Sequence, residues 1–313
     1  MKGTALVTGC AGFIGSHLVE RLLAMGYTVI GIDNFRTGRR ENISKSLEKP
    51  NFEFIEEDIT SPSFIDSITE TLDVVFHLAA IASVAFSTRD PLLVNRYNVE
   101  GTLNVLEMAR RQHAKRLVFA SSAAVYGDPD TLPVKEEFPL KSLSPYAASK
   151  IAGEYYVQAY GNSFGLEYVI LRFFNVYGPR QDESEYSGVI GIFASRAVQG
   201  LPLKIEGDGL QTRSFIHVRD VIEAIVQSGE RDTAKNQIMN VSGEDAVSII
   251  ELAQKISKIT GAEIVHEAPR IGDIQHSIGD TSRIKEVLGA TTPVPLTEGL
   301  RDTLQWYRQR FSD

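Results

Sequence analysis

Cysteine is nearly absent from this 313-residue sequence, and long apolar runs are absent altogether. The single cysteine, Cys10, excludes an intrachain disulfide, which is typical of a protein from a reducing compartment. No apolar run approaches the roughly 20 residues that cross a membrane, and the first residues lack the apolar core of a secretory signal. We therefore expect a cytoplasmic protein without a membrane partner. Cys10 itself lies in a glycine-rich loop, where it is better interpreted as a small filler than as a nucleophile.

Basic residues are in the minority, with 32 Lys and Arg against 40 Asp and Glu and a formal net charge of -8. This balance argues against a nucleic-acid-binding surface, although a local group of arginines can still bind a small anion. Two of the histidines, His17 and His217, have no companion at a spacing typical of a metal site, and we predict no metal. The content of 43% hydrophobic and 23% charged residues is ordinary for a globular protein.

The first half of the chain alternates short apolar runs with segments of helical period. The apolar runs predict buried strands at residues 4–8, 28–32, 52–55, 74–78, 117–120 and 168–171. The segments between them, such as 16–25 and 99–112, predict amphipathic helices. Strands that are apolar throughout and alternate with helices indicate an α/β fold with a doubly wound parallel sheet, the Rossmann arrangement.

The alternation weakens after Asn175. Residues 177–188 are rich in proline, glycine and charge and predict a loop. Further helices are predicted at 191–198, 218–228, 249–259 and 297–311, separated by short strands. We infer a smaller C-terminal α/β region that caps the sheet.

Gly9, Gly12 and Gly15 stand between the first predicted strand and the first predicted helix. Glycines at this point permit a tight turn, close approach of a pyrophosphate to the backbone and close helix packing, and the helix N-terminus favours the negative charge. The spacing departs from Gly-x-Gly-x-x-Gly, and such a turn can be purely structural. The strand before it and the helix after it nevertheless favour dinucleotide binding.

Asp33 ends the second predicted strand, where an acid accepts hydrogen bonds from the adenosine ribose. Its carboxylate would repel a 2′-phosphate, which favours NAD over NADP. Arg36 and Arg39 argue the other way, although a solvated loop explains them better. Asp58 and Ile59 follow the third strand, where they are placed to meet the adenine. The alternative for Asp58 is a cap of the turn that follows it.

The fourth predicted strand ends in His77-Leu78-Ala79-Ala80. Small residues at this point allow a cofactor to approach the backbone. A histidine at such a strand end is more often packed than catalytic.

Tyr146 and Lys150 are four residues apart, so on a helix their side chains share one face. A phenol has an ordinary pKa of about 10, and a nearby ammonium lowers it by favouring the phenolate. The pair is therefore a candidate for proton transfer at a hydroxyl group. With eleven tyrosines in the chain, this spacing alone is a weak signal, and its context decides.

Seven motifs occur in order along the chain: Gly9-x-x-Gly12-x-x-Gly15, Asp33, His77-Leu78-Ala79-Ala80, Asn98-x-x-Gly101, Ser121-Ser122-Ala123-Ala124-Val125-Tyr126-Gly127, Tyr146-x-x-x-Lys150 and Arg172-Phe173-Phe174-Asn175-Val176-Tyr177-Gly178-Pro179. Together they resemble the extended short-chain dehydrogenase/reductase family and, within it, the NAD-dependent nucleotide-sugar epimerases. The resemblance covers essentially the whole chain.

This resemblance implies three catalytic residues. Tyr146 would take the proton from the sugar 4-hydroxyl, Lys150 would hold the nicotinamide ribose and lower the pKa of Tyr146, and Ser122 would hydrogen-bond the reacting oxygen. A strand-end cap is the alternative for Ser122. In this family the 4-keto sugar turns over and the hydride returns to its opposite face, so NAD is regenerated. The expected reaction is the interconversion of UDP-glucose and UDP-galactose.

The resemblance also assigns binding residues. Those for NAD are Gly9, Gly12, Phe13, Ile14, Gly15, Asp33, Asn34, Asp58, Ile59, Leu78, Ala79, Ala80, Asn98, Tyr146, Lys150 and Phe173. Those for the UDP-sugar are Ser83, Ser122, Asn175, Val189, Lys204, Arg213, Arg270, Asp273 and Ser277, with the two arginines clamping the diphosphate. We expect the NAD-binding domain at residues 1–175, joined by 214–242, and the nucleotide-sugar-binding region at 176–213 and 243–313.

Related dehydratases and decarboxylases resemble one another in carrying an acid where this chain has Ala123 and Ala124, which favours epimerisation. Ser277 replaces a bulky tyrosine of hexose-specific relatives, and Ala82 replaces a lysine, so we hypothesise that the N-acetylhexosamine pair is also accepted. A UDP-glucuronate 4-epimerase and a non-catalytic NAD-binding regulator are the alternatives. By analogy with relatives, we expect a homodimer through residues 95–112 and 146–162.

Overall fold

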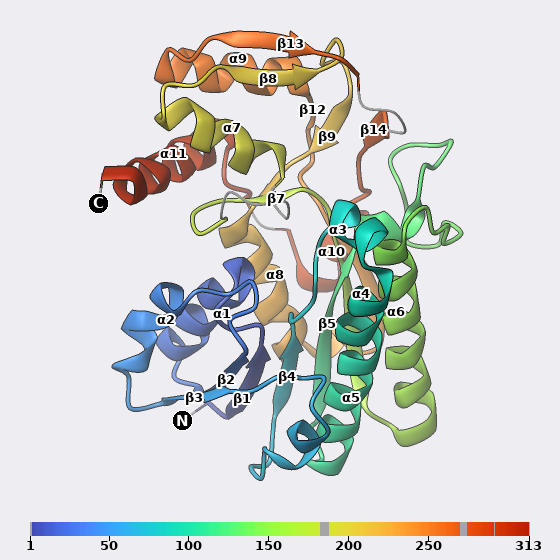
Figure 1. The fold of residues 1–313 in the computed structure, drawn as a ribbon. Helices are drawn as coiled ribbons and strands as arrows, with labels where there is room; N and C mark the ends of the chain where they lie inside the picture. Colours follow the sequence, from blue (N-terminus) through green and yellow to red (C-terminus); the bar gives the residue numbers. More distant parts are fainter. Residues whose placement is uncertain (1, 182–187, 270–273, 291, 313) are drawn as a thin grey trace.

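The computed structural model describes residues 2–312 except 182–187, 270–273 and 291. Its centre is a seven-stranded sheet in which every neighbouring pair of strands is parallel (Figure 1). The strands, in spatial order, are β11 (Gln237–Val241), β6 (Glu167–Phe173), β5 (Arg116–Ser122), β4 (Val74–His77), β1 (Thr4–Thr8), β2 (Thr28–Asp33) and β3 (Phe52–Glu56).

The sheet confirms the predicted α/β fold with a doubly wound parallel arrangement. The six strands expected from apolar runs are all present, with ends that differ by up to two residues. The order of strands reverses between β1 and β4, because β2 and β3 lie on one side of β1 and the later strands on the other. A parallel sheet binds ligands outside the carboxyl ends of its strands at such a reversal.

Helices cover both faces of the sheet (Figure 1). One face carries α1 (Phe13–Ala24), α2 (Arg40–Leu47), α8 (Val218–Glu230) and α10 (Ser282–Leu288). The other carries η1 (Pro62–Asp66), α3 (Val84–Arg89), α4 (Pro91–Asn95), η2 (Arg96–Glu100), α5 (Gly101–Arg111) and α6 (Pro145–Phe164). In α1, Leu18, Val19 and Leu22 form the apolar stripe that faces the core. Among the described residues, no helix combines the length and the apolar character that crossing a bilayer requires.

The predicted helix at 99–112 is longer than expected, because α4, η2 and α5 follow one another without a break from Pro91 to Arg111. The middle piece, η2, is a π turn, a feature that often occurs at functional sites. A Cβ on Gly101, which follows this turn, would lie 2.7 Å from Cδ1 of Ile59. The close packing explains why glycine stands there.

Most of the chain after β6, apart from α8, β11 and α10, forms a separate layer over the carboxyl ends of the sheet strands (Figure 1). Its helices are α7 (Val189–Val198), α9 (Ile249–Thr260) and α11 (Leu296–Ser312). Its strands pair as β7 (Val176–Tyr177) with β10 (Ile216–His217), β8 (Leu203–Glu206) with β13 (Ile264–Glu267), and β9 (Thr212–Ser214) with β12 (Ala246–Ser248) and β14 (His276–Ser277). Short turns at η3 (Ala123–Tyr126) and η4 (Asp232–Ala234) complete the described elements.

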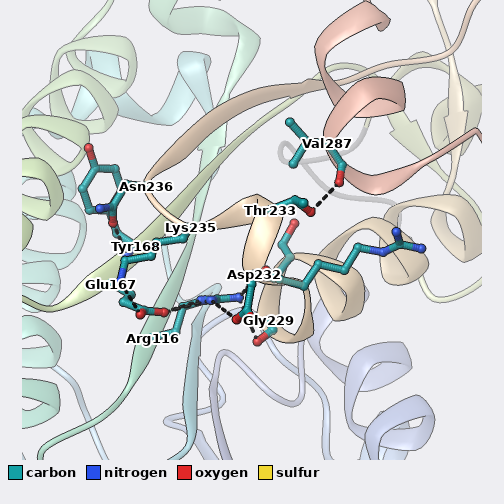
Figure 2. A network of polar contacts seen from close by, with 11 residues as sticks. Arg116, Glu167, Tyr168, Gly229, Asp232, Thr233, Lys235, Asn236 and Val287 are labelled. Carbon is teal, nitrogen blue, oxygen red and sulfur yellow. Dashed lines mark hydrogen bonds and ion pairs between the residues drawn. The ribbon is translucent and has the colours of Figure 1, made fainter.

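A buried arginine ties the opposite, amino ends of the strands together (Figure 2). Arg116, 2% exposed at the start of β5, donates through Nη2 and Nε to Glu167 at distances of 2.8 and 3.2 Å. Its Nη1 donates to the carbonyl oxygens of Ser228, Gly229 and Arg231 at 3.2, 3.3 and 2.7 Å, which satisfies the end of α8. The network therefore stabilises the amino ends of the strands, whereas ligands are expected at the carboxyl ends.

Candidate active site

A cavity of about 630 Å³ opens at the carboxyl ends of the strands, where the strand order reverses. It is lined by 14 of the residues expected to bind the cofactor: Gly9, Gly12, Phe13, Ile14, Gly15, Asp33, Asn34, Ile59, Leu78, Ala79, Ala80, Tyr146, Lys150 and Phe173. These side chains come from separate parts of the sequence, and the parallel sheet brings them to one edge.

The glycine-rich loop between β1 and α1 leaves no room for side chains. Gly9 has a φ of +72°, and a Cβ on Gly15 would lie 2.0 Å from the carbonyl oxygen of Gly9. Gly12 at the N-cap of α1 has no side chain with which to satisfy the first N–H groups of the helix. The loop therefore forms a cradle in which the backbone of a helix N-terminus is accessible to a phosphate group.

Asp33, at the end of β2, lines the same cavity. Its carboxylate accepts hydrogen bonds from the backbone N–H groups of Ala11, at 3.0 Å, and Phe35, at 2.8 Å. Burial raises the pKa of Asp33, and these hydrogen bonds act in the opposite direction. A Cβ on Gly38 would lie 2.8 Å from either carboxylate oxygen, so the chain passes close to the acid. The cradle and the acid together fit a dinucleotide.

Two of the expected cofactor residues, Asp58 and Asn98, do not line the cavity. Asp58 accepts hydrogen bonds from Thr60, Asn34 and Tyr97, which matches the alternative of a turn cap and positions neighbours that do line it. Asn98 is 1% exposed and exchanges hydrogen bonds with the backbone of Ile81. It therefore holds the wall of the cavity.

His77 is packed, as the sequence indicates. Its ring nitrogens lie 2.7 Å from Oγ1 of Thr8 and 3.0 Å from Oγ1 of Thr102. Burial, aided by the charge of Lys150, lowers the pKa of His77 to about 3, so the ring is neutral. Cys10 is also buried, and burial raises the pKa of its thiol, in agreement with a filler.

Tyr146 and Lys150 lie in the first turns of α6, at the inner end of the cavity. The helix begins at Pro145, and the hydroxyl of Ser144 caps it by accepting from the N–H of Ala147 at 3.1 Å. Ser122, at the end of β5, hydrogen-bonds the phenol of Tyr146. The structure thus brings the three residues expected to be catalytic to one place.

Burial opposes ionisation of both members of the pair. Burial raises the pKa of Tyr146, and the hydrogen bond with Ser122 acts in the opposite direction. The ammonium of Lys150 donates to the carbonyl oxygen of Ala120 at 2.8 Å. Burial lowers the pKa of Lys150 to about 8, while the Glu154 carboxylate acts to raise it. Sequence spacing identified the pair, but it could not show that burial dominates.

Comparison with known proteins identifies the family. A family model described as "NAD dependent epimerase/dehydratase family" matches residues 5–242. A UDP-glucose 4-epimerase from Mycolicibacterium smegmatis is 40% identical over 309 residues, which are 97% of this chain and 98% of that protein.

Two solved structures agree. A UDP-glucose 4-epimerase with UDP-glucose from Thermotoga maritima is 36% identical, with a TM-score of 0.92 over 98% of this chain and 99% of its own. A UDP-N-acetylglucosamine 4-epimerase from Methanobrevibacter ruminantium, in complex with UDP-N-acetylmuramic acid, is 37% identical, with a TM-score of 0.93 over 99% and 100%.

This chain belongs to the NAD-dependent epimerase/dehydratase family. Membership confirms the resemblance noted in the sequence, and it confirms NAD as the cofactor. The glycine cradle and Asp33 are accordingly the residues that would hold the NAD diphosphate and adenosine ribose.

The residues that we expect to bind the UDP-sugar form two groups in this chain. Asn175, Arg213 and Ser277 are close together: Ser277 pairs with Arg213 across β14 and β9, and Nδ2 of Asn175 donates to the carbonyl oxygen of Ser214 at 3.0 Å. Arg213 donates to the backbone oxygens of Thr212 and Gln275, at 2.9 and 3.3 Å.

The other expected contacts are more dispersed. Ser83 caps α3 by accepting from the N–H of Phe86 at 3.0 Å. Val189 begins α7, and Lys204 on β8 pairs with Glu267 at 2.5 Å. Arg270 and Asp273 lie outside the described residues.

Some residues that line the cavity were not among those expected to bind NAD. They are Ile32, Arg36, Thr37, Gly38, Arg39, Asn42, Glu57, Ile81, Ala82, Tyr97, Ala120, Ser121, Arg180 and Gln181. Most are neighbours of assigned residues, so adjacency could have identified them. Arg180 and Gln181 come from the predicted loop after β7, and no local pattern indicates that this loop reaches the cavity.

Proposed function

We propose that this protein is an NAD-dependent UDP-sugar 4-epimerase that interconverts UDP-glucose and UDP-galactose. The observation that carries the proposal is the placement of Tyr146 and Lys150 in the lining of a dinucleotide cavity, with Ser122 hydrogen-bonded to Tyr146 and followed by two alanines. Tyr146 accepts the proton of the sugar 4-hydroxyl, Ser122 hydrogen-bonds the reacting oxygen, and Lys150 supplies positive charge. NAD bound in the cavity supplies reversible hydride transfer at C4.

The two alanines favour epimerisation over elimination. Ala123 and Ala124 begin η3 directly after Ser122, so only methyl groups occupy the positions at which dehydratases and decarboxylases are expected to carry an acid. Loss of water or of carbon dioxide needs a group that transfers a proton at those positions. The similarity to 4-epimerases from Mycolicibacterium smegmatis and Thermotoga maritima supports the same reaction.

Tyr146→Phe tests the chemistry. It removes the proton acceptor but keeps the ring, so we expect turnover to fall by at least roughly 10²-fold, in the range of general-base catalysis. NADH binding, measured by its fluorescence, should persist. Turnover at the wild-type rate would overturn the proposed mechanism, and loss of NADH binding would mean that the variant disturbs the cavity instead.

We also propose that the sugar pocket accepts a 2-acetamido group. Ser277 supports this, because a small side chain pairs with Arg213 where hexose-specific relatives are expected to have a tyrosine. The test is incubation with UDP-glucose, UDP-N-acetylglucosamine and UDP-glucuronate, followed by separation of the C4 epimers of each. Ser277→Tyr should lower turnover of the acetylated sugar and spare UDP-glucose. Turnover of UDP-glucuronate alone would replace this proposal with the glucuronate epimerase.

A homodimer through residues 95–112 and 146–162 is a further part of the proposal. The surface around α6 supports it, because Tyr155 and Phe164 on α6 are 60% and 57% exposed and Leu92 on the adjoining α4 is 82% exposed. Covering exposed apolar side chains favours association. Light scattering checks this, and a mass near 34.5 kDa, that of a single chain, would contradict it.

A further inference from the structure

Arg180 has an unusual conformation that the proposed reaction does not explain. It follows Pro179, has a φ of +68°, and its side chain is 18% exposed. Nη2 donates to Oε1 of Glu20 at 2.6 Å. Nη1 is buried and has no hydrogen-bond partner among the residues that the structure describes. A positive φ in a residue other than glycine persists only where the surroundings impose it.

Contacts on both sides impose that conformation. On one side, Nε2 of His17 lies 2.9 Å from the carbonyl oxygen of Pro179. On the other side, the hydroxyl of Tyr307 on α11 donates to the carbonyl oxygen of Gln181, and Nε2 of Gln181 donates to the carbonyl oxygen of Val176 at 3.0 Å. The neighbours of Arg180 are therefore held by α1 and by the C-terminal layer, and its guanidinium is held by Glu20 on α1.

The segment lies against the face of α1 that leads to the glycine cradle. Phe13, His17 and Glu20 share this face, and the rings of Phe13 and His17 meet edge to face at 6.2 Å between their centroids. The charge of Arg180 contributes to the lowered pKa of His17, after burial, which agrees with their proximity. Arg180 and residues 12–15 line the same cavity.

The cavity needs a cation near the cradle. A diphosphate carries two negative charges, whereas a helix N-terminus supplies only about half a positive charge. The other basic residues that line the cavity in the described part of the chain are Lys150, Arg36 and Arg39. Lys150 lies beside Tyr146, and both other arginines follow Asp33. Arg180 is the one that pairs with a residue of α1, Glu20.

We propose that Arg180 binds the diphosphate of NAD, with Nη1 donating to a phosphate oxygen while Glu20 holds Nη2. This contact goes beyond the epimerase reaction, because it concerns how the cofactor is retained. It also has a mechanical consequence: cofactor binding joins α1 to the segment after β7, which leads into the C-terminal layer.

The test measures cofactor binding without turnover. NADH is titrated into nucleotide-free protein and followed by fluorescence, with ADP-ribose, adenosine and UDP as competitors or in calorimetry. For Arg180→Met we expect affinity for NADH and ADP-ribose to fall by roughly 10- to 100-fold, the effect of losing one charge-assisted hydrogen bond. Adenosine, which lacks phosphate, and UDP should bind as they do to the wild type.

Two variants complete the design. Arg180→Lys keeps a positive charge and should lose less affinity for NADH than Arg180→Met, which also provides a measurement if the methionine variant does not fold. Arg21→Met is the matched control, because Arg21 is on the same helix and pairs with Glu223 at 2.7 Å outside the cavity; its NADH affinity should be unchanged.

Three results would overturn the proposal. Unchanged NADH affinity in the Arg180 variants would show that the guanidinium does not touch the cofactor. Equal losses for adenosine and ADP-ribose would show a general disturbance of the cavity. A loss of UDP affinity with NADH unaffected would place Arg180 at the diphosphate of the substrate.

Discussion

The buried ion pair beneath the proposed catalytic residues allows a quantitative prediction. Glu154 on α6 is 0% exposed and Arg172 on β6 is 3% exposed. Arg172 donates to both carboxylate oxygens, at 2.9 and 2.7 Å, and Ser121 donates to the carboxylate at 2.5 Å. Glu154 follows Lys150 by one helical turn, so the pair fixes the helix that carries Tyr146.

Breaking this pair is costly because either single substitution leaves one buried charge without its partner. Glu154→Met leaves a buried guanidinium without its partner, and Arg172→Met leaves a buried carboxylate, so each should lower the free energy of unfolding by about 3–5 kcal/mol. The double variant leaves no buried charge. It still loses the hydrogen bonds to Ser121, to Tyr126 and to the carbonyl oxygen of Glu136, at about 1 kcal/mol each, so we expect a total cost of about 2–3 kcal/mol.

Urea unfolding of the four proteins, followed by circular dichroism, measures this double-mutant cycle. The two single costs should exceed the cost of the double variant by at least about 3 kcal/mol. The exposed pair Arg40–Glu56, with side chains 60% and 59% exposed, is the matched control, and its coupling should be at most about 1 kcal/mol. If the single costs of the buried pair simply add in the double variant, the reasoning from burial is wrong.

Three further predictions follow from single residues. Gly15→Ala places a methyl group 2.0 Å from the carbonyl oxygen of Gly9, so NADH fluorescence titration should show loss of binding in a protein that remains folded. Because the pKa of Lys150 is lowered from 10.5 to about 8, kcat should fall as the pH rises through about 8. The unfolded state keeps the proton of Lys150 up to a higher pH than the folded state does. The free energy of unfolding of the wild type should therefore rise between pH 8 and 10.5 relative to that of Lys150→Met, as measured by urea titrations. Arg116→Met should lower stability by about 3–5 kcal/mol, measured in the same way, yet leave kcat within about twofold, because its partner Glu167 lies at the other end of the sheet.

The elements and the cofactor cradle could be predicted because their signals are local. An apolar run of four to six residues predicts a buried strand wherever it occurs, and the glycine at position 15 reflects a steric conflict with Gly9, only six residues away. The spacing of Tyr146 and Lys150 is likewise contained within one helical turn. Such features depend little on how the rest of the chain folds.

Features that join distant parts of the chain could not be predicted. His17 meets the carbonyl oxygen of Pro179 across 162 residues, and Arg116 reaches that of Arg231 across 115. The sequence around Arg116 and around Arg180 does not distinguish either residue from a surface arginine. Asn98 exchanges hydrogen bonds with the backbone of Ile81, a contact that exists only once the helix and loop have packed.

The effect of burial on Tyr146 is a further property that the sequence spacing does not show, and it narrows the mechanism. Spacing showed a cation near the phenol, whereas the structure shows that burial opposes charge on both members of the pair: it raises the pKa of Tyr146 and lowers that of Lys150. Two buried groups that both resist ionisation make a weak base unless positive charge is supplied next to the phenol. Glu154 acts the other way, because it favours the charged form of Lys150 and so preserves the cation that a phenolate needs. The ion pair of Glu154 with Arg172 therefore affects both the stability of α6 and the protonation of Lys150, which precedes Glu154 by one helical turn.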